Sequence, residues 1–135
     1  MNHTAVAAVG LYTVLNTVIL FWLIVATSRL RRRYKVWVGT GGVAHLERVM
    51  RGHANAIENM PMTLLLLLIA ALLGTPVLAL HLLGIAFTIG RVLHAWHFIE
   101  EKGAPWQREA GFGLSGLATV VAMAVVLGHA FGFVI

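Results

Sequence analysis

The feature that most constrains this chain is the alternation of long apolar segments with short polar connections. The four apolar segments occupy residues 5–28, 44–73, 77–99 and 110–134. A helix of about 20 residues rises about 30 Å, which is the thickness of the hydrocarbon core of a bilayer. The pattern therefore predicts an all-α integral membrane protein, a four-helix bundle that forms a single domain over residues 1–135.

Composition supports the membrane assignment. The chain has 135 residues, of which 59% are hydrophobic and 11% are charged, whereas soluble domains contain about 25% charged residues. At this length we expect no extramembrane domain beside the spanning segments. The first segment has no basic stretch before it and is longer than the apolar region of a cleaved signal peptide, so we expect it to be retained.

The net charge of +5 is concentrated in two connections. Most Lys and Arg residues follow the first and third segments, and the connection at residues 74–76 has none. The positive-inside rule then places both basic connections in the cytoplasm and both termini on the opposite side. Because this charge sets topology, we expect no nucleic-acid partner. The absence of Cys excludes disulfides and thiolate metal sites, and we predict no metal site.

The second segment is different because polar residues fill its first half. The apolar run at residues 62–73 is too short to span a bilayer, so we expect one continuous helix with Pro61 inside it. Spacings of three or four residues place polar side chains on one face of a helix. On the second segment these are Arg48, Arg51, Asn55 and Glu58. On the third segment the residues that share a face are Arg91, His94 and Phe98.

The short second connection allows the depths of these residues to be compared. At 1.5 Å per residue, Glu58 lies about 25 Å and Arg91 about 24 Å from the turn, so the two polar faces can meet. Such a pair would offset the cost of two charges inside the membrane and could be purely structural. The further charges of Arg48 and Arg51 favour instead a site for a zwitterionic, polyanionic ligand.

Two motifs on these faces are recognisable. The pattern E-R-x-x-R-x-H-x-N-x-x-E-N-x-P begins at Glu47, and G-R-V-L-H occupies residues 90–94. With the helix count and the basic first connection, they resemble the MAPEG family, the membrane-associated proteins in eicosanoid and glutathione metabolism, over nearly the whole chain. The resemblance implies a homotrimer that binds glutathione as co-substrate between neighbouring protomers. The short connections resemble bacterial members, so we expect an inner-membrane location.

The resemblance also implies roles for individual residues. The residues implied to bind glutathione are Arg48, Arg51, Asn55, Glu58, Arg91, His94 and Phe98. Arg108 resembles the arginine that faces the thiol, and Arg29 or Arg31 resembles the first-helix arginine that reaches the neighbouring site. Phe98 stands where well-studied members have a tyrosine, so one hydroxyl contact is absent.

The chemistry of glutathione agrees with these residues. Arginine forms paired hydrogen bonds with carboxylates, and Glu58 suits the ammonium group. A free thiol has a pKa near 8.5, which a nearby arginine lowers. We therefore predict a glutathione-dependent membrane transferase or peroxidase that acts on lipophilic electrophiles or hydroperoxides, with Arg108 stabilising the thiolate.

Other functions stay open at this point. A non-catalytic member of the family would bind membrane lipids or a partner without turnover, and Phe98 favours this alternative. A small multidrug exporter also has four short helices, but it carries a carboxylate in its first helix, and residues 5–26 contain none. A haem protein would use histidines of two helices, such as His53 and His94, and would show a haem spectrum.

Overall fold

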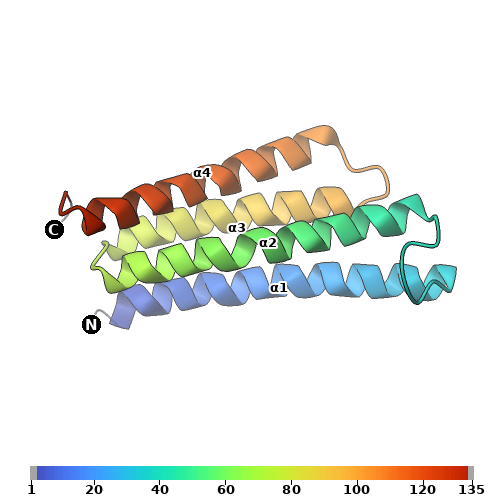
Figure 1. Ribbon diagram of the computed structural model, residues 1–135, viewed down its shortest axis with the longest axis horizontal. Helices are drawn as coiled ribbons and strands as arrows, with labels where there is room; N and C mark the ends of the chain where they lie inside the picture. The colour runs from blue at the N-terminus through green and yellow to red at the C-terminus, as the bar shows by residue number, and fades with distance from the viewer. Residues whose placement is uncertain (1–2, 134–135) are drawn as a thin grey trace.

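The computed structural model describes residues 3–133 of the chain. Four α-helices form an antiparallel bundle (Figure 1). Their bounds are α1 His3–Tyr34, α2 Ala44–Leu72, α3 Val77–Ile99 and α4 Pro105–Ala130. Each helix is long and apolar enough to cross a membrane. The predicted all-α fold with four membrane helices is confirmed.

The two ends of the bundle differ in their connections (Figure 1). The start of α1, the end of α4 and the α2–α3 turn lie at one end, which we call the hairpin end. The α1–α2 and α3–α4 connections lie at the other, which we call the loop end. The α2–α3 turn is tight because Gly74 adopts a left-handed conformation with φ of 98°, and Pro76 then caps α3. This turn makes α2 and α3 antiparallel neighbours.

Two helices are longer at the loop end than the sequence predicts. Helix α1 continues through its basic residues to Tyr34 instead of ending at residue 28, because arginine favours helices and complements the dipole of the last turn. Helix α4 begins at Pro105 rather than near residue 110, because proline suits the first helical position. Arg108 therefore lies on a helix and not in a loop.

Helix α2 is continuous from Ala44 to Leu72 with Pro61 inside it, as predicted. Membrane helices tolerate proline because neighbouring groups can satisfy the backbone carbonyl that loses its partner. Hydropathy alone would have begun this helix near residue 62. Its continuity places the polar first half of the segment on the same rigid element as the apolar second half.

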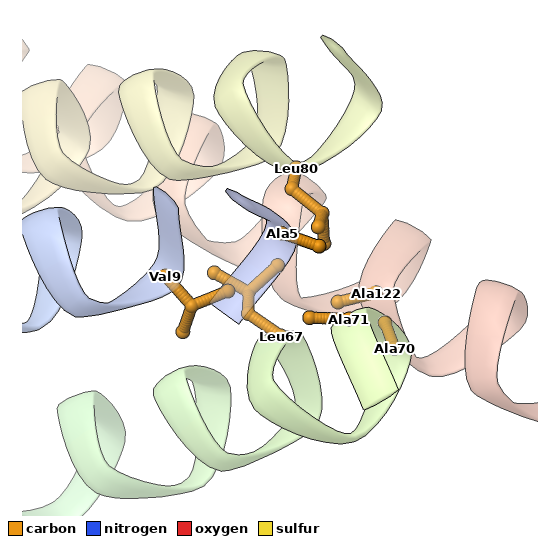
Figure 2. Packing of buried hydrophobic residues seen from close by; sticks show 7 residues of the cluster. All are labelled: Ala5, Val9, Leu67, Ala70, Ala71, Leu80 and Ala122. Atoms are coloured by element: carbon orange, nitrogen blue, oxygen red, sulfur yellow. The ribbon is translucent and has the colours of Figure 1, made fainter. Parts of the chain in front are cut away.

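The core at the hairpin end joins all four helices (Figure 2). Its buried side chains are Ala5, Val9, Leu67, Ala70, Ala71, Leu80 and Ala122. Most of them are small, so the helix backbones approach closely. In a bilayer this close packing stabilises the bundle through van der Waals contact, since lipid offers apolar side chains no less favourable a surrounding than protein does.

Helices α3 and α4 touch backbone to backbone through Gly90 and Gly111. A Cβ atom added at Gly90 would lie 2.6 Å from the backbone nitrogen of Ser115, and one added at Gly111 would lie 2.7 Å from that of His94. Neither distance leaves space for a side chain. The glycines therefore hold the first turns of α4 against the part of α3 that carries His94.

Candidate functional site

A cavity of about 800 Å³ opens at the loop end between α2, α3 and the start of α4. Its volume lies in the range of pockets that hold small-molecule ligands. The lining residues are Arg48, Arg51, Ala54, Asn55, Glu58, His94, His97, Phe98, Gly103, Pro105, Arg108, Glu109 and Phe112. Seven of the ten predicted site residues thus share one cavity, although they come from three helices.

The cavity carries both signs of charge, with an excess of positive charge. The lining contains three arginines and two glutamates, so with neutral histidines its net charge is +1. Arg51 is exposed, and its Nε lies 3.7 Å from a carboxylate oxygen of Glu47 one turn away. An exposed pair of this kind contributes only about 0.5 kcal/mol or less. The Arg51 guanidinium can therefore exchange Glu47 for a carboxylate of a ligand at small cost.

Arg91 lies behind the cavity wall, where its side chain is 2% exposed. Its Nη2 donates to Asn55 Oδ1 at 3.1 Å and to His94 Nδ1 at 3.4 Å. The predicted ion pair between Arg91 and Glu58 does not form, since within residues 3–133 the one ion pair is that of Arg51 and Glu47. Glu58 is exposed, whereas the guanidinium of Arg91 points to an acceptor one turn nearer the loop end. Arg91 therefore orients Asn55 and His94.

Arg48 lines the cavity, but α3 uses most of its donors. Its Nε donates to the carbonyl oxygens of His97 at 3.2 Å and Glu100 at 3.1 Å. Its Nη2 donates to the carbonyl oxygen of His97 at 2.7 Å and to His97 Nε2 at 2.6 Å. His97 lies in the last turn of α3 and Glu100 is its C-cap, so these carbonyls have no partner within the helix. Arg48, predicted as a ligand contact, lines the cavity and also connects α2 to α3.

Phe98 packs among the charged groups of the cavity wall. Its ring centre lies 4.9 Å from that of His94 and 5.1 Å from that of His97, and the Arg48 guanidinium lies 5.5 Å from it. Phe112 on α4 also lines the cavity. None of the described lining residues has a hydroxyl group. The cavity therefore offers amide, guanidinium, imidazole and carboxylate groups beside an apolar surface.

Arg29 and Arg31, the two site candidates on α1, do not line this cavity. Arg31 donates from Nη1 to the carbonyl oxygens of Val36 at 3.2 Å and Gly39 at 3.0 Å, which holds the α1–α2 connection. Arg29 is exposed and lines a separate groove that also contains Trp22. Of the two candidates, Arg31 is the one that hydrogen-bonds to the α1–α2 connection.

Several cavity residues were not predicted. They are Ala54, His97, Gly103, Pro105, Glu109 and Phe112. The spacing of three residues from His94 was a usable signal for His97. Pro105 and Glu109 were missed because α4 was expected to begin near residue 110, which left them in a loop with no helical face.

The chain is similar to known proteins over most of its length. The sequence profile of the MAPEG family matches residues 9–128, which include every residue of the cavity. Inner membrane protein YecN of Escherichia coli is 34% identical over 89 residues, which are 66% of this chain and 68% of that protein. The uncharacterized protein sll1147 of Synechocystis is 30% identical over 122 residues, which are 90% of this chain and 86% of that protein.

Proposed function

Since this chain belongs to the MAPEG family, we propose that it is a glutathione-dependent membrane transferase or peroxidase that acts on lipophilic electrophiles or hydroperoxides. The observation that carries the proposal is the cavity that gathers Arg51, Glu58 and Arg108 from α2 and α4. Glutathione has two carboxylates, one ammonium group and one thiol. The cavity offers Arg51 for a carboxylate, Glu58 for the ammonium group and Arg108 for the thiolate, in a volume suited to a small ligand.

The binding groups of the proposed site lie mainly on α2. Arg51 presents a guanidinium that can bind a carboxylate through two hydrogen bonds. Glu58 and Glu109 can accept hydrogen bonds from the ammonium group. Because Asn55 Oδ1 accepts from Arg91, the Nδ2 group of Asn55 remains to donate to a peptide carbonyl of the ligand.

Arg108 is the proposed stabiliser of the thiolate. It lies in the first turn of α4, where the helix dipole adds to the positive potential, and both effects lower the pKa of a nearby thiol. In a transferase reaction the thiolate sulfur bonds to the electrophilic carbon, and the leaving group departs with its electron pair. In a peroxidase reaction two glutathione molecules reduce the hydroperoxide to an alcohol and water and form a disulfide.

The second substrate would bind on the apolar side of the cavity. Phe98 and Phe112 supply this surface, and Phe112 is 63% exposed on the outside of the protomer. A lipophilic molecule dissolved in the bilayer can therefore reach the cavity without first entering water.

We further propose that the site is completed in a homotrimer, in which Arg29 of one protomer approaches the cavity of the next. The bonds that Arg31 makes to its own connection favour Arg29 for this role. The name of the YecN relative supports a bacterial inner-membrane location. The basic residues at the loop end favour a cytoplasmic cavity, on the side where the cellular glutathione pool lies, with both termini on the opposite side.

A non-catalytic family member that binds membrane lipids or a partner is the second candidate. Phe98 and the absence of hydroxyl groups among the described lining residues favour it, because a hydroxyl is one of the groups that can stabilise a thiolate. This candidate requires ligand binding without conjugation and without hydroperoxide reduction.

Calorimetric titration of glutathione into the detergent-purified protein tests the proposal. We expect saturable binding that weakens roughly 10- to 100-fold in Arg51→Ala and in Glu58→Ala, since a hydrogen bond to a charged group contributes about 1.5–3 kcal/mol. Arg32→Ala is the matched control, because it removes an exposed charge of the loop end outside the cavity. A well-folded wild type that does not bind glutathione would overturn the proposal.

Turnover separates the two candidates. Bound glutathione should show thiolate absorbance near neutral pH, and the protein should conjugate a chlorinated nitroaromatic or reduce a lipid hydroperoxide. Binding with neither reaction would favour the non-catalytic candidate.

A further inference from the structure

His97 is buried, with 6% of its surface exposed, between Arg48 and the start of α4. Its Nδ1 lies 2.9 Å from the carbonyl oxygen of Ala104, and its Nε2 lies 2.6 Å from Arg48 Nη2. A carbonyl oxygen only accepts hydrogen bonds and a guanidinium only donates them. His97 is therefore neutral, with its proton on Nδ1, and both ring nitrogens are occupied by the protein.

The carbonyl oxygen that accepts from His97 Nδ1 belongs to the residue just before α4. Ala104 is the N-cap of α4, and its side chain makes no capping hydrogen bond. Arg108 follows in the first turn of this helix. On its other side His97 accepts from Arg48, which also bonds to the carbonyl of Glu100. One line of hydrogen bonds thus runs from α2 through α3 to the helix that carries Arg108.

Gly103 is independent evidence that the α3–α4 connection packs tightly against His97 and Arg48. A Cβ atom at this position would collide with the carbonyl oxygen of His97 and would lie 2.8 Å from Arg48 Nη2. The α3–α4 connection can take this path only with a residue that has no side chain. Gly103 and His97 therefore both keep the α3–α4 connection close to Arg48.

We propose that His97 is a positioning residue, which couples Arg48 on α2 to the start of α4 and so sets the place of Arg108 relative to Arg51 and Glu58. His97 does not act on the ligand, because neither ring nitrogen is available to it. The catalytic consequence rests on the proposed function. The structural consequence does not, since every contact in the line lies within the protein.

The structural consequence is tested without glutathione, by hydrogen exchange of the backbone amides of residues 100–108. We expect His97→Leu to accelerate their exchange at least about tenfold, because two hydrogen bonds that hold the connection are lost. His97→Gln keeps one donor and one acceptor and should restore much of the protection. Gly103→Ala should also accelerate exchange, because its Cβ displaces the His97 carbonyl.

His129→Leu is the matched control. It removes a histidine at the hairpin end that hydrogen-bonds to Thr75 Oγ1 at 3.1 Å, and it should leave the exchange of residues 100–108 unchanged. Unchanged exchange in His97→Leu, or equal acceleration in His129→Leu, would overturn the positioning role.

The catalytic consequence is tested by kinetics on the folded fraction. If the wild type turns over glutathione, His97→Leu should lower kcat about tenfold and change the KM for glutathione by less than about threefold, because Arg51 and Glu58 keep their places on α2. The pH at which the bound thiolate forms should rise, and His97→Gln should recover most of the loss. A loss that affects KM alone would contradict the proposal. Absence of binding by the wild type would instead overturn the proposed function, and hydrogen exchange would still decide the role of His97.

Discussion

The hairpin end and the loop end of this bundle are held together by different interactions. At the hairpin end the shared core of all four helices is apolar and mostly alanine (Figure 2). At the loop end a guanidinium, an imidazole and backbone carbonyls connect α2, α3 and the start of α4 around a cavity of about 800 Å³. The same helices thus form a tightly packed region and a polar, open one.

In this bundle, the contacts that stabilise the fold and the groups available for chemistry lie at different ends. Apolar contacts between small residues set the helix positions without presenting reactive groups. Charged side chains inside a membrane are stable where they bond to protein or border a wet cavity, and this is the situation of Arg48, Arg91 and Arg108 at the loop end. Substitutions at the two ends should therefore have separable effects.

The largest effect is expected at the loop end. Replacing Arg108 with alanine should lower kcat/KM for glutathione conjugation about 100-fold, because loss of one group that stabilises developing negative charge commonly costs about 2.7–4 kcal/mol. Thermal stability should hardly change, since Arg108 is exposed. Lys102→Ala, an exposed charge outside the cavity, is the control. Full activity of Arg108→Ala would show that another group stabilises the thiolate.

The opposite pattern is expected at the hairpin end. Leu67→Ala should destabilise the bundle by roughly 2 kcal/mol, measured as unfolding in detergent, because it leaves a cavity among four packed helices. The glutathione affinity of the folded protein should remain that of the wild type. Leu78→Ala removes a leucine of α3 that is 71% exposed and should change stability much less. A large loss of affinity in Leu67→Ala would mean that the two ends are coupled.

The smallest effect is expected for a substitution in the cavity wall, Phe98→Tyr. Phe98→Tyr adds a hydroxyl to a wall whose described residues have none, and it should strengthen glutathione binding about 3- to 10-fold, as one hydrogen bond contributes about 0.5–1.5 kcal/mol. Phe131→Tyr adds the same group at the exposed hairpin end and should have no effect. Weaker binding by Phe98→Tyr would show that the hydroxyl is buried without a partner.

Much of the fold and of the cavity could be predicted from local sequence patterns. Hydropathy predicted four helices, and the short segment after Pro61 predicted that α2 must include its polar half. Helical spacing grouped Arg51, Asn55 and Glu58 on the face that does line the cavity. These predictions succeeded because they depend on the length and periodicity of a single helix, which the backbone geometry determines residue by residue.

The partners of the long polar side chains were decided only by the tertiary structure. Counting along the helices placed Arg91 opposite Glu58, yet its guanidinium bonds to Asn55, and Arg48, which lines the cavity, also bonds to His97. An arginine side chain can reach as far as one helical turn, about 5.4 Å, so helical depth cannot choose between acceptors one turn apart. That choice depends on how closely the neighbouring helices approach, and α2 and α3 are close at Gly52, where an added Cβ atom would lie 2.5 Å from Phe98 Cβ.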